Sequence, residues 1–160
     1  MSQELYTDVL NNLEIPCILF LNNKFKNKYL FIHSSNYEDQ NYHIDCYRKD
    51  LKTNNVISYD FKFLGYVNYP YRKETLYAEL YKNGRELSLF GKQDYFWYFI
   101  KDKPYSYIIN RKELQTYIEN GLKNNSLKIT VGPSGSDLVY FNPETLPNNV
   151  CCKSEIVYNP

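Results

Sequence analysis

Two acidic side chains and one lysine lie at spacings that suit chemistry on a phosphodiester. Asp60 and Lys62 flank Phe61 within residues 56–64, a run that alternates between polar and apolar residues in its latter half. Side chains along a strand point alternately to opposite faces, so Asp60 and Lys62 are expected to share one face. Asp45 belongs to a shorter strand-like segment, residues 43–47. We expect the two segments to form a hairpin that brings Asp45 beside the other two.

Converging carboxylates repel each other, and a hard divalent cation relieves this repulsion. Oxygen ligands suit Mg²⁺ or Mn²⁺. A neighbouring ammonium group can position a water or stabilise charge that develops on phosphorus oxygens. Asp45, Asp60 and Lys62 are therefore the minimum for metal-dependent hydrolysis of a phosphodiester. The alternative is an ordinary solvent-facing strand, where Asp and Lys at alternate positions are common.

The elements that must position these residues form a mixed pattern of helices and strands. A helix is predicted over residues 3–13 and ended by Pro16. The apolar runs 17–21 and 29–33 predict a hairpin or a helix-loop segment, and residues 34–41 a loop. Further strands are predicted over 76–81, 94–101, 105–110, 127–131 and 137–141, a helix over 111–122, and an irregular end over 142–160.

Length and composition indicate one globular domain. The chain has 160 residues, of which 43% are hydrophobic and 18% aromatic, which excludes a disordered protein. We expect a core over about 34–122 and a tail of accessory strands over 123–160. The formal net charge of +1 argues against a strongly basic nucleic-acid-binding protein, although a local basic face is compatible with it.

Cysteine spacing and hydropathy indicate the compartment. No C-x-x-C pair is present among Cys17, Cys46, Cys151 and Cys152, so a zinc ribbon is excluded and free thiols are predicted. No apolar run has the length of a membrane span, and a secretory signal is not apparent. We expect a cytoplasmic protein without membrane contact. The abundance of Tyr, Asn and Lys is typical of AT-rich genomes such as those of phages, other viruses or low-GC bacteria.

From about residue 34 to 118 the chain resembles the PD-(D/E)XK nuclease superfamily, in particular its small phage-type members. The resemblance rests on the order of short motifs, which are Ser34-Ser35-Asn36-Tyr37-Glu38-Asp39, His43-Ile44-Asp45, Tyr59-Asp60-Phe61-Lys62, Tyr77-Ala78-Glu79-Leu80, Leu89-Phe90-Gly91-Lys92-Gln93-Asp94-Tyr95 and Ile109-Asn110-Arg111-Lys112-Glu113-Leu114. Ile44 stands where the motif that names the superfamily has proline.

The resemblance implies an α/β or α+β fold of the restriction-endonuclease type, a mixed central sheet flanked by helices. It implies that Asp45 and Asp60 bind Mg²⁺ or Mn²⁺ and that Lys62 is the catalytic lysine. Glu38 matches the additional acidic ligand of the family, with Glu4 and Glu14 as rivals.

Two further positions match the family. Glu79 corresponds to an acidic, metal-binding position on the following strand, or is a surface residue. Gln93 lies where some members carry a glutamine in the site, or is a surface residue before a buried strand.

The resulting functional expectation is a Mg²⁺-dependent DNA endonuclease, acting in the host cytoplasm if the protein is viral. DNA is the expected partner, and a homodimer or a larger viral assembly is compatible with the sequence. The alternative is a catalytically inactive protein on the same fold, acting as a structural or nucleic-acid-associated subunit of a viral assembly. The near-neutral charge favours this alternative, because nucleases usually need a positive groove.

Overall fold

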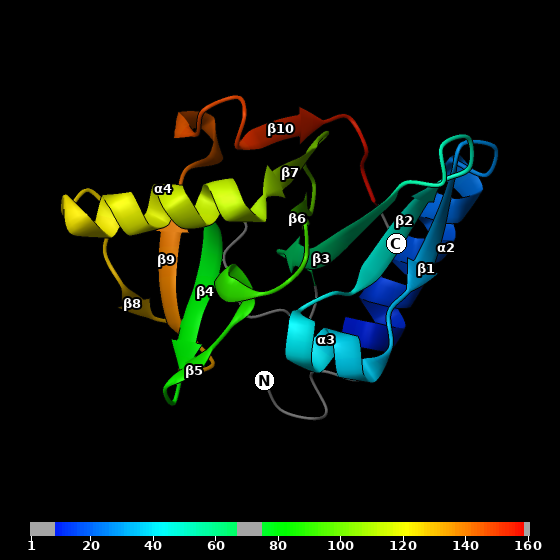
Figure 1. The fold of residues 1–160 in the computed structure, drawn as a ribbon. Coiled ribbons are helices and arrows are strands. Elements are labelled where there is room, and N and C mark those ends of the chain that lie inside the picture. Colours follow the sequence, from blue (N-terminus) through cyan, green and yellow to red (C-terminus); the bar gives the residue numbers. More distant parts are fainter. Residues whose placement is uncertain (1–8, 67–74, 159–160) are drawn as a thin grey trace.

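A computed structural model describes residues 9–66 and 75–158 and confirms a mixed α+β fold (Figure 1). A six-stranded mixed sheet has the order β1-β2-β3-β6-β7-β10, and a four-stranded antiparallel sheet has the order β5-β4-β9-β8. The larger sheet comprises β1 (Tyr29–His33), β2 (Cys46–Asp50), β3 (Val56–Leu64), β6 (Tyr95–Ile100), β7 (Ser106–Asn110) and β10 (Cys151–Ser154). The smaller comprises β4 (Leu76–Lys82), β5 (Arg85–Glu86), β8 (Thr130–Val131) and β9 (Asp137–Phe141).

The helical elements join and cover these sheets. They are η1 (Leu10–Glu14), α2 (Ile15–Lys24), α3 (Asn36–Tyr42), η2 (Ser88–Phe90), α4 (Arg111–Lys123) and η3 (Pro143–Thr145). No helix within the described residues is long and apolar enough to cross a bilayer. The four cysteines are free thiols, as predicted.

Strand β3 lies at the centre of the larger sheet and has the bounds predicted from the sequence. It pairs antiparallel with β2 and parallel with β6. The parallel register places Asp60 opposite Phe96 and Lys62 opposite Tyr98. Because pleating alternates the side chains, the two faces of β3 enter two different cores.

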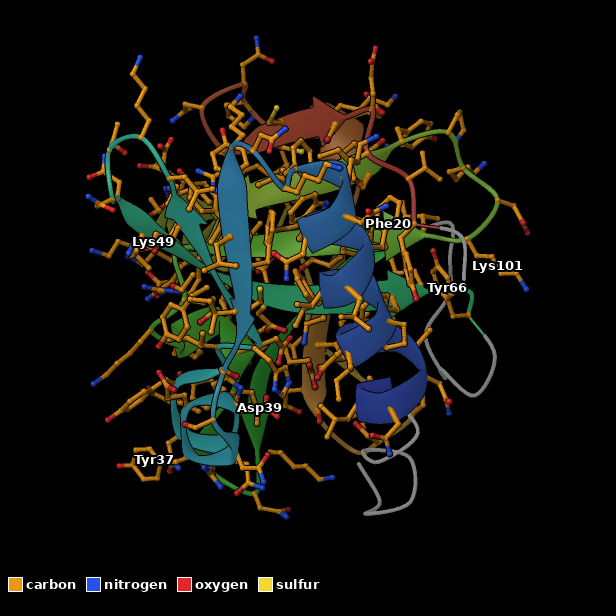
Figure 2. The ribbon with its side chains drawn as sticks, turned by 90° about the vertical axis from the view of Figure 1, so that its right-hand side faces the viewer. Phe20, Tyr37, Asp39, Lys49, Tyr66 and Lys101 are labelled. Atoms are coloured by element: carbon orange, nitrogen blue, oxygen red, sulfur yellow. The ribbon has the colours of Figure 1, made fainter. Side chains whose placement is uncertain are left out.

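One core lies between the larger sheet and α2. Figure 2 shows α2 lying across this face of the sheet. Phe63 and Trp97 each stack on Phe99, with ring centroids 5.5 and 5.0 Å apart. The helical segment contributes one buried stripe, which consists of Leu13, Cys17, Ile18 and Leu21. The strands contribute mainly aromatic residues, which are Phe31, Cys46, Tyr59, Phe61, Phe63, Trp97 and Phe99.

The other core lies between the larger sheet, the smaller sheet and α4. Its members are apolar residues from both sheets and the inner face of α4, including Leu76, Ala78, Phe96, Tyr98, Ile109, Leu114, Ile118, Leu138 and Val139. One face of the larger sheet is thus covered by a second sheet as well as by a helix. This second sheet presents Tyr77 and Glu79 of β4 towards Lys62.

Pro16 does not end the first helix, contrary to the prediction. The π-helical turn η1 continues into α2, with the N–H of Ile15 donating to the carbonyl of Leu10. Pro16 therefore lies in the first turn of α2, where a missing N–H is tolerated. The run 17–21 is helical, and 29–33 forms strand β1, so the helix-loop alternative holds. Residues 3–8 of the predicted helix, and with them Glu4, lie outside the described residues.

The polar segment predicted as a loop over 34–41 contains helix α3. Ser35 Oγ accepts a hydrogen bond from Glu38 N, while Glu38 Oε1 accepts one from Ser35 N. This reciprocal capping box satisfies two backbone donors at the start of the helix and compensates for its lack of apolar residues. The helix ends at Tyr42, and the next residue, His43, adopts the left-handed conformation at φ 57°. Figure 2 shows Tyr37 projecting outward from α3.

Three other boundaries differ from the sequence prediction. Strand β2 begins at Cys46, not at residue 43, and the strand predicted over 127–131 shortens to β8. The end predicted to be irregular contains β10, which pairs antiparallel with β7. The segment Cys151–Ser154 has no alternating pattern, and the edge of β7 supplies the hydrogen bonds that make it a strand.

Asn22 of α2 closes the free edge of β1. Its Nδ2 donates to Phe31 O at 2.8 Å, and Phe31 N donates to its Oδ1 at 2.7 Å. The amide thus takes the place of a neighbouring strand at the middle of β1. Blocking an edge in this way prevents it from pairing with another chain.

Candidate active site

Asp60 and Lys62 share the face of β3 that is turned towards the smaller sheet, as the alternation predicted. Both side chains are buried, and Lys62 Nζ lies 3.3 Å from Asp60 Oδ2. Beyond this ion pair, Asp60 Oδ2 has no hydrogen-bond partner among the described residues. The site therefore contains a buried carboxylate oxygen with unused acceptor capacity.

Asp45 joins this pair from the residue just before β2. Its backbone N–H donates to Tyr59 O at 2.8 Å, which extends the β2–β3 pairing by one residue. Its Oδ2 accepts from Phe61 N at 2.7 Å, so the carboxyl group reaches across β3 beside Asp60. The structure thus brings together the three residues that the sequence selected.

The two aspartates resist being ionised at the same time. Burial, followed by the charges of Glu14 and Asp60, raises the pKa of Asp45 well above its usual value. Burial also raises the pKa of Asp60 to about 6, although the charge of Lys62 and a hydrogen bond with Asp45 oppose the change. A cation bound between the two carboxyl groups would relieve this penalty.

Glu79 of β4 approaches the same lysine from the smaller sheet. Its Oε1 lies 2.9 Å from Lys62 Nζ, so Lys62 bridges Asp60 and Glu79. Burial raises the pKa of Glu79, but the attraction and hydrogen bond of Lys62 outweigh this and leave the pKa below its usual value. Glu79 therefore faces the ammonium group of Lys62, and it orients the lysine rather than completing a set of carboxylates around Asp60.

Glu38 does not join the cluster. Its Oε1 is engaged by Ser35 in the capping box, and Tyr47 OH donates to its Oε2. These hydrogen bonds lower the pKa of Glu38. The predicted ligand is thus a capping residue of α3, because both of its oxygens serve to hold the helix and Tyr47 in place.

Glu14, one of the rivals, is the acidic residue that the fold buries near Asp45. Its charge raises the pKa of Asp45, and its Oε2 lies 3.9 Å from His33 Nε2. That oxygen accepts no hydrogen bond from any described residue. A sequence signal exists, because Glu14 lies four and seven residues before Ile18 and Leu21 and so shares their buried helix face.

Two further polar residues are the half-buried His43 and the buried Gln93. Burial and the charge of Lys62 lower the pKa of His43 to about 4, so this imidazole is neutral at physiological pH. Gln93 is buried, not on the surface, and its Nε2 donates to Ser88 O at 2.8 Å. His43 stands in the motif His43-Ile44-Asp45 but had no predicted role, and its position depends on the left-handed residue that follows α3.

The donor set fits a divalent cation held by two carboxylates. Within residues 9–66 and 75–158, no group of three or more His, Cys, Asp or Glu side chains is arranged to hold a metal ion. Mg²⁺ needs fewer protein ligands, because it keeps several waters and often binds through one or two carboxylates together with substrate phosphates. Asp60 Oδ2, which accepts no hydrogen bond from a described residue and lies beside Lys62, and the adjoining carboxyl group of Asp45 meet this requirement.

Comparison of the chain with protein families, curated proteins and solved structures returns no match. The candidate active site is the cluster Asp45, Asp60, Lys62 and Glu79.

Proposed function

We propose that the protein is a Mg²⁺- or Mn²⁺-dependent endonuclease that hydrolyses phosphodiester bonds in DNA. The observation that carries the proposal is the meeting of Asp45 and Asp60 across β2 and β3, with Lys62 Nζ 3.3 Å from Asp60 Oδ2. Such a site combines a place for a hard cation with a fixed ammonium group. Both are needed to stabilise negative charge on a phosphate under attack by water.

Each residue has a distinct task in this proposal. Asp45 and Asp60 would hold the cation, which when bound would supply Lewis-acid stabilisation of the phosphate and a water of lowered pKa. Lys62 orients the attacking water and stabilises the charge that develops on the phosphate oxygens. Glu79 is a positioning residue, because its hydrogen bond at 2.9 Å fixes the ammonium group of Lys62.

A cleavage assay on plasmid and branched DNA, with Mg²⁺ or Mn²⁺, tests the proposal. Asp60→Ala and Lys62→Ala are expected to lower the cleavage rate by about 10²–10³-fold, the usual cost of removing a group that stabilises the transition state. Asp50→Ala is the matched control, since Asp50 lies at the far end of β2 and its carboxylate serves only the following turn. Equal activity in wild type, Asp60→Ala and Lys62→Ala would identify a contaminating nuclease and overturn the proposal.

A non-catalytic protein on this fold is the second candidate, and one observation favours it. Lys62 is held by two acidic residues, with Nζ 3.3 Å from Asp60 and 2.9 Å from Glu79. An ammonium group paired in this way can serve as a buried structural link. This candidate, a nucleic-acid-associated subunit of a viral assembly, predicts DNA binding without cleavage and no stabilisation of the protein by Mg²⁺.

A further inference from the structure

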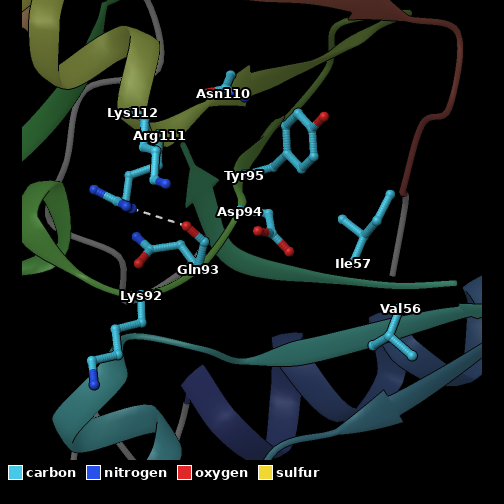
Figure 3. Close-up of a pocket in the computed structure, with 9 residues that line it drawn as sticks. All are labelled: Val56, Ile57, Lys92, Gln93, Asp94, Tyr95, Asn110, Arg111 and Lys112. Atoms are coloured by element: carbon cyan, nitrogen blue, oxygen red, sulfur yellow. Dashed lines mark hydrogen bonds between the residues drawn. The ribbon is translucent and has the colours of Figure 1, made fainter.

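We propose that the cavity at the start of α4 binds a phosphate of the nucleic-acid backbone and leads the strand to Asp60. The inference rests on the proposed function for the identity of the ligand, and it adds the place where the backbone is held. The cavity has a volume of about 470 Å³. Figure 3 shows its lining, which is Val56, Ile57, Lys92, Gln93, Asp94, Tyr95, Asn110, Arg111 and Lys112.

A buried guanidinium, that of Arg111, forms no ion pair with a described residue, although the charge of Asp94 acts on it and opposes the lowering of its pKa by burial. Arg111 is 8% exposed, and it donates to Gln93 O, Leu89 O and Gln115 Oε1, all of which are neutral. Since burying a cation without an ion pair is unfavourable, this part of the cavity wall favours an anionic ligand.

The only acidic residue in the lining is occupied. Asp94 Oδ2 accepts hydrogen bonds from Ser58 N at 2.9 Å and from Ser58 Oγ at 3.1 Å. These bonds tie the start of β6 to β3 and direct the carboxylate towards the strand. Among the described residues, the lining therefore has three cationic side chains against one carboxylate, an excess of positive charge.

Two lysines add exposed positive charge to the cavity. Lys112 is the second residue of α4, and Lys92 lies with its Nζ 4.4 Å from the centroid of the Tyr42 ring. The N-terminus of the helix has a partial positive charge that acts in the same direction. Together with Arg111, these groups give the cavity the positive charge that a polyanion requires.

The location of the cavity connects it to the candidate active site. Val56 lies four residues before Asp60 on β3 and on the same face, so their Cα atoms are about 13 Å apart along the strand. That span corresponds to about four phosphates of one B-form strand. A backbone bound at the cavity thus extends along β3 to the level of Asp60 within a few nucleotides, a span that a free phosphate ion does not cover.

Binding measurements with a fluorescent single strand and a fluorescent duplex, in EDTA so that no cleavage occurs, test the inference. Wild type is expected to bind one of them with an affinity that falls as salt rises. The double variant Lys92→Ala/Lys112→Ala is expected to bind at least about 10-fold more weakly. The slope of log Kd against log salt is expected to fall by about 1.4–1.8, since each lost phosphate contact contributes about 0.7–0.9.

The matched control is Lys26→Ala/Lys123→Ala, which makes the same change in charge at exposed positions away from the cavity. It is expected to keep the wild-type affinity and slope. Equal affinity and slope in Lys92→Ala/Lys112→Ala and wild type would overturn the inference. Binding of inorganic phosphate at the cavity, with no binding of either oligonucleotide, would overturn it too and would identify a free anion as the ligand.

The same variants separate this inference from the proposed function. Asp60→Ala is expected to bind the oligonucleotide like wild type but not to cleave it. If wild type binds the oligonucleotide at the cavity but shows no cleavage that depends on Mg²⁺ or Mn²⁺, only the enzymatic proposal is refuted. Normal cleavage by Lys92→Ala/Lys112→Ala at wild-type substrate affinity would refute only the role of the cavity.

Discussion

Replacing Asp60 by Asn is expected to stabilise the folded protein at neutral pH, although it removes one charge from an ion pair. Burial raises the pKa of Asp60 from 3.8 to about 6, even with Lys62 beside it. The folded state therefore binds the proton more tightly than the unfolded chain. This contribution to stability is complete below about pH 4 and is lost as the pH rises through about 6.

The magnitude follows from the two pKa values. One pKa unit corresponds to about 1.4 kcal/mol, so ionised Asp60 costs the folded state about 3 kcal/mol at pH 7.5. Asn has the shape of the protonated aspartate without its charge, and Lys62 keeps Glu79 as a partner at 2.9 Å. We expect Asp60→Asn to raise the free energy of unfolding by up to about 3 kcal/mol at pH 7.5, and by less than about 1 kcal/mol at pH 4.

Urea denaturation of wild type and Asp60→Asn at the two pH values measures this difference. Asp50→Asn is the control of opposite sign, because backbone N–H groups of Thr53 and Lys52 lower the pKa of Asp50. Its charge therefore stabilises the folded state at neutral pH, and its removal should not stabilise the protein. An Asp60→Asn variant no more stable than wild type at pH 7.5 would refute the reasoning.

Three further substitutions test contacts that stabilise the fold. Asn22→Ala should cost about 1–3 kcal/mol in urea denaturation, because buried Phe31 loses both backbone partners; an unchanged midpoint would contradict this. Ser35→Ala should cost about 1 kcal/mol through loss of the capping box, and Ser35→Asp should restore most of it. Tyr66→Phe removes the 2.6 Å hydrogen bond to Tyr158 O and should speed hydrogen exchange at the C-terminal segment, whereas equal exchange would show that this bond does not hold it.

Local sequence patterns were sufficient for the main strands and the best helix. Strand β3 has the predicted bounds, Val56–Leu64, and its alternation correctly places Asp60 and Lys62 on one face. The helix predicted over residues 111–122 is α4, Arg111–Lys123. Both succeed for the same reason: the pattern of apolar residues repeats with the period of the element, and no distant contact has to override it.

Tertiary structure decided which acidic residues approach Lys62. Glu38 matched the family pattern by its place in the sequence, but its oxygens are used within α3 and by Tyr47. Glu79 meets Lys62 only because the smaller sheet packs over the face of β3. Contacts of this kind join residues far apart in the chain, so neither spacing nor periodicity encodes them.

The sequence by itself determined which residues the candidate site contains, because the pleat of β3 puts Asp60 and Lys62 on one face and Asp45 directly precedes the strand that pairs with β3. Only the tertiary structure decided the state of these groups. Burial between the two sheets raises the pKa of Asp60 to about 6, sets Glu79 against Lys62 and leaves Arg111 without an ion pair among the described residues. The reason is physical: the cost of a charge depends on the solvent and partners around it, and these come from packing rather than from neighbours in the chain.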